Sequence, residues 1–340
     1  MLKTGFGSVT GQRAIKQFLR ASLSNDRLSH AYIFEGPKGI GKKTMANAFA
    51  GALVCEAGRD DACGDCMGCV LARSGSHPDI TKVVCAPDRH SVGVDDIRHV
   101  VAEVYLKPYY GKRRVFIIED TDAMTEQAQN ALLKIFEEPP LYAVFILLTA
   151  NSRQLLETVR SRGLVLTFCP YTADEIEDAL SADVPDMREN YDFLKAYSHN
   201  NIGRALELAL DEGFTAMRSE ASGLLAAMLE GSGKSACALA QFSEKHKENA
   251  DRLFEIIISM LRDIFFLCLG CRGLTVNADM LPLLEAAAKR LTPVRARRAL
   301  EGAIEANERI NRNANYNLAI MTWLCGIWED AHGRDSRSKV

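Results

Sequence analysis

The sequence predicts an α/β fold in which a parallel sheet with flanking helices is followed by a region that is helical throughout. Short apolar segments alternate with longer helical patterns over about the first 165 residues, as in parallel α/β units. A glycine-rich loop separates one apolar segment from the helix after it, and from Pro170 onward strand patterns largely stop. We therefore expect an α/β domain of the nucleotide-binding type at residues 1–169, a small helical domain at 170–212 and a larger helical domain at 213–340.

The strands of the α/β domain are predicted from short, buried-type apolar runs at residues 31–34, 79–84, 115–118, 144–148 and 165–168. A helix is expected from Thr44 to about Leu53, directly after the glycine-rich loop. A second helix is expected to be capped by Thr125 and stopped by Pro139-Pro140, because its apolar residues recur at helical spacing. Helical patterns at 253–269 and 294–310 belong to the last domain.

Composition indicates a globular protein of ordinary type, with 25% charged and 47% hydrophobic residues. A formal net charge of −3 argues against a general nucleic-acid coat protein. The first residues lack the apolar core of a signal peptide. The apolar run 143–150 is too short to cross a bilayer, and the run 255–270 carries Arg262 and Asp263. We therefore expect a cytoplasmic protein with no membrane partner.

The glycine-rich loop has the form of a phosphate-binding loop with one altered position. The pattern G-x-x-x-x-G-K-[ST] uses backbone N–H groups and a lysine for phosphate oxygens, and a hydroxyl for Mg²⁺. Lys43 stands at the hydroxyl position, and Thr44 comes one residue late, which rotates its side chain by about 100° around the helix. Whether ATP binds stays open, and so does a turn that merely positions the helix. The candidate residues of the loop are Gly36, Gly39, Gly41, Lys42, Lys43 and Thr44.

Two carboxylates follow the strand at 115–118, where an ATPase of this type usually ends the strand in Asp-Glu. The Asp then orders Mg²⁺, and the Glu polarises the attacking water. Here the order is inverted to Glu119-Asp120, so each carboxylate has an altered reach. We interpret the pair as a degenerate form of this motif in which hydrolysis is weakened or lost.

Four of the ten cysteines are clustered as Cys55, Cys63, Cys66 and Cys69. Thiolates at this spacing predict a tetrahedral site with four sulfur ligands, which for zinc is structural, and an iron–sulfur cluster is the alternative. Cys63, Cys66 and Cys69 are expected on a tight loop and Cys55 at the end of the preceding helix, within a zinc insertion at residues 55–69. His77, in His77-Pro78-Asp79, is not needed as a ligand, and we expect a turn there.

These motifs resemble those of the bacterial DNA polymerase III clamp loader, within the AAA+ superfamily. The resemblance extends over about residues 5–210. It implies a RecA-like module, a helical lid at 170–212 and an oligomerising collar at 213–340. It rests on residues 28–34, the phosphate loop, the cysteine cluster, residues 77–79, 130–134 and 137–140, and Ser161-Arg162.

Two types of clamp-loader subunit share these motifs, a gamma/tau motor that hydrolyses ATP and a delta-prime stator that generally does not. Lys43, the inverted Glu119-Asp120 and the short chain favour the delta-prime type. The resemblance implies that Arg162 is an arginine finger acting in trans on the ATP of a neighbouring motor. It also implies that Arg204 is at the sensor 2 position and residues 149–151 in the sensor 1 region. Gly163 departs from the family, which often has a cysteine there.

The partners implied by the resemblance are the gamma/tau and delta subunits, the sliding clamp and, through the complex, primer–template DNA. Two alternatives stay open at this point. The chain could be an active motor ATPase, for which purified protein would hydrolyse ATP appreciably. It could instead be a zinc-containing nucleic-acid-binding module, which would bind DNA tightly and in a salt-sensitive manner.

Overall fold

The computed structural model describes residues 5–85, 92–229, 233–312 and 314–332. The chain divides into two compact units. The first comprises Met1–Ala182 with Asn200–Arg204, and the second comprises Asp183–His199 with Ala205–Val340. All three boundaries between these units fall inside the segment 170–212. The three-domain division with a separate lid there stays a prediction.

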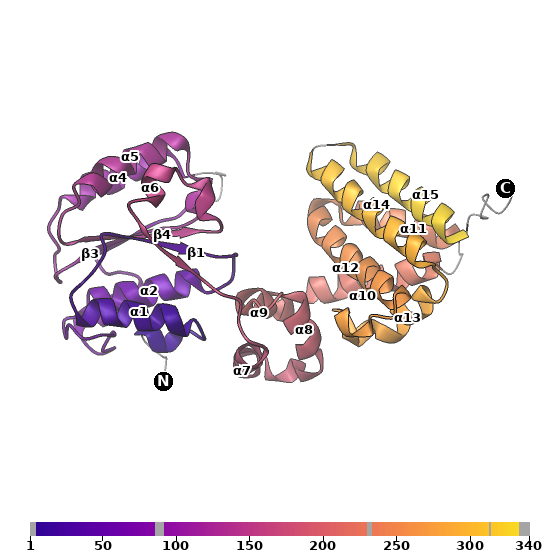
Figure 1. The fold of residues 1–340 in the computed structure, drawn as a ribbon, viewed down its shortest axis with the longest axis horizontal. Coiled ribbons are helices and arrows are strands. Elements are labelled where there is room, and N and C mark those ends of the chain that lie inside the picture. The colour runs from indigo at the N-terminus through magenta and orange to yellow at the C-terminus, as the bar shows by residue number, and fades with distance from the viewer. Residues whose placement is uncertain (1–4, 86–91, 230–232, 313, 333–340) are drawn as a thin grey trace. The chain divides into compact units, whose positions relative to one another are not determined.

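The first unit is built on a parallel sheet of five strands in the order β2-β3-β4-β1-β5 (Figure 1). This confirms the predicted α/β class. Ile33 of β1 lies opposite Leu147 of β4 and Val165 of β5. The loops after β1 and β4 therefore leave the same carboxyl edge side by side, where open α/β sheets bind ligands. The strands are β1 (Ala31–Glu35), β2 (Ile80–Val83), β3 (Arg114–Ile118), β4 (Ala143–Thr149) and β5 (Leu164–Thr167).

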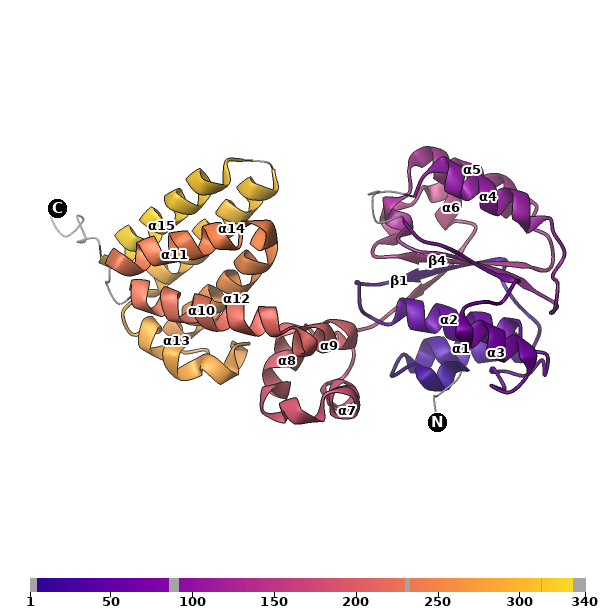
Figure 2. The same ribbon diagram turned by 180° about the vertical axis from the view of Figure 1, so that it is seen from behind.

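Helices cover both faces of this sheet (Figure 2). β3 and β4 are buried along their whole length, and apart from Arg114 and Thr149 they are apolar, because neither face of the central strands meets water. One face is covered by α1 (Arg13–Ser24), α2 (Lys42–Leu53) and α3 (Met67–Ser74), and the other by α4 (Val94–Val104), α5 (Glu126–Glu137) and α6 (Glu157–Arg160). Short 3₁₀ turns are η1 (Gly5–Ser8), η2 (Thr121–Ala123) and η3 (Ser152–Gln154).

Aromatic side chains fill the core beneath α5. Phe116 and Phe145 stack with their ring centroids 5.1 Å apart, and Phe136 of α5 meets Phe145 edge-on at 5.2 Å. The predicted cap of this helix is confirmed, because the Thr125 side chain accepts a hydrogen bond from the Ala128 N–H. The first unit ends in α7 (Ala173–Asp183) and takes up the first turn of α9 (Ile202–Leu210).

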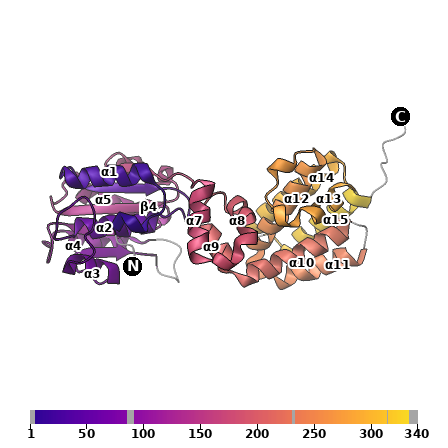
Figure 3. The same cartoon turned by 90° about the horizontal axis from the view of Figure 1, so that it is seen from below.

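The second unit is all helical, as predicted for the C-terminal part of the chain (Figure 3). At its centre α12 packs against α10, α13 and α14, and eight of its side chains are buried. Its helices are α8 (Tyr191–Tyr197), the rest of α9, α10 (Glu212–Leu229), α11 (Gly233–Lys245), α12 (Ala250–Cys268), α13 (Leu281–Ala288), α14 (Pro293–Asn311) and α15 (Tyr316–His332). Turns of 3₁₀ type are η4 (Pro185–Asn190), η5 (Lys247–Asn249), η6 (Arg272–Leu274) and η7 (Ala278–Met280).

A buried polar network holds this unit together. The fully buried Asp263 carboxylate accepts hydrogen bonds from the N–H groups of Val276 and Asn277 and from the Asn277 amide. Arg218 donates to both carboxylate oxygens of Asp279 at 2.6 and 2.8 Å, and to Asn277 Oδ1 at 2.8 Å. Its guanidinium also lies 3.6 Å from the centre of the Phe193 ring.

Among the described residues, no helix combines the length and the apolar character that crossing a membrane requires.

Candidate functional site: a phosphate loop with an internal ion pair

The phosphate loop (residues 36–43) joins β1 to α2 at the carboxyl edge of the sheet. Gly39 and Gly41 have φ values of 85° and 88°, a region that side chains with a Cβ rarely adopt. Each position is also crowded. A Cβ at Gly39 would lie 2.7 Å from Asn201 Oδ1, and one at Gly41 would lie 2.6 Å from the Tyr171 hydroxyl. The loop therefore requires glycine for both its conformation and its packing.

Three groups from outside the loop hold its carbonyl oxygens. The Tyr171 hydroxyl donates to Ile40 O at 2.9 Å, Asn201 Nδ2 donates to Lys38 O at 2.7 Å, and the Gly203 N–H donates to Gly39 O at 3.2 Å. Because the C=O and N–H of a trans peptide point in opposite directions, these bonds turn the N–H groups of Gly39 and Gly41 away from the donors. This is the orientation that a phosphate-binding loop needs.

Lys42 is folded onto its own loop. Its ammonium group donates to Gly36 O and, at 3.0 Å, to Pro37 O. Burial lowers the pKa of Lys42, and the carboxylates of Asp122 and Asp120 oppose this shift. The lysine expected to bind phosphate oxygens is thus at the predicted place, with carboxylates nearby.

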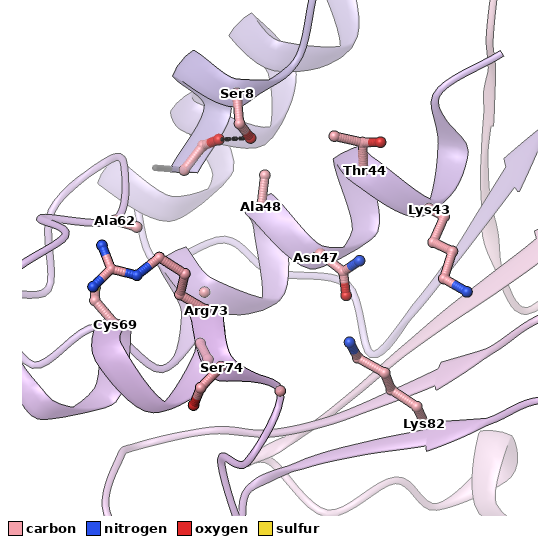
Figure 4. Close-up of a pocket in the computed structure, with 14 residues that line it drawn as sticks. Ser8, Lys43, Thr44, Asn47, Ala48, Ala62, Cys69, Arg73, Ser74 and Lys82 are labelled. Atoms are coloured by element: carbon pink, nitrogen blue, oxygen red, sulfur yellow. Dashed lines mark hydrogen bonds between the residues drawn. The ribbon is translucent and has the colours of Figure 1, made fainter. Parts of the chain in front are cut away.

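Lys43 forms an ion pair with Glu119, the first of the two carboxylates after β3. Its Nζ lies 2.9 Å from Glu119 Oε1 and 3.0 Å from Oε2. The Glu119 side chain is only 12% exposed, whereas that of Lys43 is 62% exposed. An ammonium group thus occupies the position of the hydroxyl ligand and pairs with a carboxylate that would otherwise face a divalent cation. Thr44 leaves α2 in a different direction (Figure 4), so these residues do not fit Mg²⁺.

The other residues predicted for this site lie at the same edge. Asp120 is exposed and adopts a left-handed conformation with φ 47° at the start of η2. Asp122, which the sequence analysis did not single out, accepts hydrogen bonds from Thr149 Oγ1 at 3.0 Å and from the Ala150 N–H at 2.9 Å. Arg204 lies in the first turn of α9, and its backbone N–H donates to Asn201 Oδ1.

Arg162 lies shortly after α6, and its guanidinium group contacts α6 and the end of α5. Nη1 donates to Thr158 O at 3.0 Å, and Nη2 pairs with Glu137 Oε1 at the end of α5 at 3.1 Å. The side chain is 35% exposed, and an exposed ion pair of this kind is weak enough to be exchanged for a stronger partner. A Cβ at Gly163 would lie 2.7 Å from Ile33 Cδ1, so the glycine that departs from the family accommodates this isoleucine.

The four clustered cysteines come together at the far end of α2, about 18 Å from the loop by the length of that helix. Cys55, Cys63, Cys66 and Cys69 have their sulfur atoms within 4.8 Å of one another. Cys63 Sγ lies 3.8 Å from Cys69 Sγ, and Cys66 Sγ lies 4.0 Å from Cys55 Sγ. Tetrahedral sulfurs about 2.3 Å from a zinc ion are about 3.8 Å apart, so the group fits a metal.

Backbone N–H groups support these sulfurs. Those of Cys63, Cys66 and Cys69 each donate to a cluster sulfur at 3.4 Å. Hydrogen bonds from the N–H groups of Cys66 and Asp65 lower the pKa of Cys63 to about 6. Cys55 follows the end of α2. The tight loop predicted for the other three cysteines was wrong in one respect, because Cys66 caps α3 and Cys69 lies inside that helix, whose first turn supplies the Cys69 N–H.

His77 stays outside the cysteine group, in the predicted turn. Its Nδ1 accepts the Asp79 N–H at 3.0 Å. Asp79 is fully buried, and its carboxylate accepts the backbone N–H groups of Tyr109, Tyr110 and Gly111 at 2.6, 2.8 and 3.4 Å. The sequence analysis missed this role, because an acidic residue before a strand carries no sign of a partner thirty residues away.

Two family models match the chain in succession. That of the DNA polymerase III delta subunit matches residues 11–172, and that of its C-terminal region matches residues 218–329. The DNA polymerase III subunit delta' of Bacillus subtilis (strain 168) is 29% identical over 310 residues, which cover 89% of this chain and 92% of the relative. The chain belongs to the delta-prime family of DNA polymerase III clamp-loader subunits.

The motor-type relatives match a smaller part. The DNA polymerase III subunit tau of B. subtilis is 37% identical over 172 residues, which cover 50% of this chain but only 30% of that protein. A solved structure of a gamma subunit-related protein from Thermotoga maritima covers 94% of this chain and 99% of its own at 17% identity, with a TM-score of 0.44. The AAA+ character of the first unit is seen in its strand order and in the phosphate loop between β1 and α2.

Proposed function

We propose that the chain is a stator of the clamp loader, which completes the ATP site of a neighbouring gamma/tau motor with Arg162 and hydrolyses little or no ATP itself. The observation that carries this proposal is the contrast between two positions. Lys43 and Glu119 are paired with each other where a motor would hold Mg²⁺, whereas Arg162 is held by a weak, partly exposed ion pair. The assembled complex would open the sliding clamp and place it on primer–template DNA.

Further parts of the proposal concern ligands and partners. We assign Zn²⁺ with a structural role to the four cysteines, because their spacing fits four sulfur ligands and leaves no open position. Nucleotide could bind the phosphate loop through Lys42 and the N–H groups of Gly39 and Gly41. The gamma/tau and delta subunits would be the neighbours in the complex, with residues 170–212 as lid, residues 213–340 as oligomerising collar, and the cytoplasm as location.

The test is DNA-stimulated ATP hydrolysis by a complex reconstituted with gamma/tau and delta, carrying either the natural chain or Arg162→Ala. An arginine finger raises the rate of hydrolysis about 10³-fold or more at the ATP site it serves. Total ATP turnover of the complex should therefore fall by the fraction that this one site contributes. Arg160→Ala, two residues away, is the matched control and should leave turnover unchanged. Co-elution of all subunits would confirm that assembly survives, and normal turnover of the Arg162→Ala complex would refute the assignment.

The motor-type similarity supports a second candidate, an active ATPase. It predicts appreciable ATP hydrolysis by the purified chain without other subunits. The stator predicts none above background, so one measurement separates the two.

A further inference from the structure

Glu119 holds a positively charged partner within the chain itself. The carboxylate is placed at the end of β3 by a hydrogen bond from its own N–H to Val83 O at 2.9 Å, and its side chain is 12% exposed. A carboxylate this far from water is costly unless a cation accompanies it. Lys43 provides that cation, with Nζ about equally close to both carboxylate oxygens.

The geometry favours a specific pair over a chance surface contact. Lys43 is 62% exposed and is free to extend into water, as long lysine side chains usually do. Lys43 and Lys82 of β2 line one cavity of about 520 Å³ (Figure 4). Lys82 forms no ion pair with any other residue that the structure describes. Two exposed lysines thus share one surface, and one of them turns to the carboxylate.

Two ammonium groups already accompany the carboxylates of this edge without a metal ion. Lys43 is paired with Glu119, and the carboxylates of Asp122 and Asp120 lie near enough to Lys42 to oppose the lowering of its pKa. A divalent cation at Glu119 would have to displace Lys43 and would find no hydroxyl ligand in its place. In a motor-type loop the same carboxylate remains available to the metal.

We propose that Lys43 is the resident counter-ion of Glu119 and makes nucleotide binding at this loop independent of Mg²⁺. The ligand class is a free nucleoside triphosphate, bound by Lys42 and the loop N–H groups without its usual metal. This inference rests on the proposed function, since it concerns the loop that the stator does not use for hydrolysis.

The experiment is calorimetric titration of the full-length protein with ATP, in Mg²⁺ and in EDTA, for the natural chain, Lys43→Thr and Lys82→Thr. The natural chain and Lys82→Thr should bind ATP with the same affinity in both buffers. Lys43→Thr restores the hydroxyl and frees Glu119, so it should bind ATP at least about tenfold more tightly in Mg²⁺ than in EDTA, a difference of about 1.4 kcal/mol.

A second measurement, thermal unfolding, needs no nucleotide. In Lys43→Thr the unpaired Glu119 should lower the midpoint temperature of unfolding, and added Mg²⁺ should restore part of that loss. Mg²⁺ should not change the midpoint temperature of the natural chain or of Lys82→Thr. Three results would overturn the proposal: a natural chain that binds no ATP in either buffer, a natural chain that needs Mg²⁺ to bind ATP, or a Lys43→Thr chain with the natural chain's response to Mg²⁺ in both measurements. None of these results bears on Arg162, whose assay records hydrolysis by the neighbouring subunit.

Discussion

At the scale of single residues, buried charged side chains do most to fix the conformation of loops in this protein. Asp79 shows this most clearly, because one fully buried carboxylate receives three consecutive backbone N–H groups of the loop before β3. That loop exposes the aromatic side chains of Tyr109 and Tyr110, which are 79% and 50% exposed. The carboxylate thus holds in place a segment whose own side chains bury little surface.

We expect Asp79→Asn to lower the free energy of unfolding by about 2–3 kcal/mol, since the hydrogen bonds lose their charged acceptor and an amide N–H₂ faces backbone donors. Urea denaturation followed by circular dichroism would measure the change. Asp95→Asn is the control, because the Asp95 side chain forms an exposed pair with Arg98, and its substitution should change stability by less than about 0.5 kcal/mol. Equal effects of the two substitutions would contradict the role given to Asp79.

At the scale of elements, the segment between α2 and β2 depends on its cysteines. Helix α3 has only eight residues, too few to be stable alone, and it begins at a cysteine cap. Of the loop before it, residues 56–62 are mostly exposed and bury few apolar side chains. A metal ion held by both ends of the segment would supply the stability that packing does not.

Removal of the metal should therefore unfold this segment locally while the sheet stays intact. We expect one zinc per chain by elemental analysis, and after chelation a large rise in hydrogen exchange confined to about residues 55–75. Cys63→Ser should mimic chelation, and Cys169→Ser, at an exposed cysteine outside the cluster, should not. A metal-free chain with natural exchange rates in α3 would contradict the structural role.

The elements also show what the sequence could and could not predict. Apolar runs bounded by turn-forming residues predicted all five strands to within two residues at each end, because strands covered on both faces consist largely of apolar residues. Helices α1 and α4 were not assigned, although their buried apolar residues recur at helical spacing. The loop glycines and cysteines were found from spacing. Tyr171 and Asn201 were not, because their partners lie more than 130 residues away in the chain.

At the scale of the whole molecule, the two units have separate cores. The first is organised around its sheet, with Phe116 and Phe145 at the centre, and the second around α12. Units with their own cores are expected to unfold as separate cooperative transitions.

We therefore expect two thermal transitions in calorimetry, of which Arg218→Ala should lower only one. Removing Arg218 leaves the Asp279 carboxylate and Asn277 without their partner and should destabilise the second unit by about 3–5 kcal/mol. Arg297→Ala, in an exposed pair with Glu301, is the control and should shift neither transition. A single transition, or a shift of both by Arg218→Ala, would show that the units unfold together.

The ion pair between Lys43 and Glu119 also bears on how such a subunit could change in evolution. In the genetic code threonine is one base change from lysine, so the hydroxyl of a motor-type loop is a short mutational step away. That single step, however, leaves a carboxylate that is only 12% exposed without its cation until a metal ion takes the place of the ammonium group. The intermediate is penalised unless Mg²⁺ compensates at once. A chain with this ion pair would therefore acquire ATP hydrolysis less readily than its sequence distance from a gamma/tau subunit suggests.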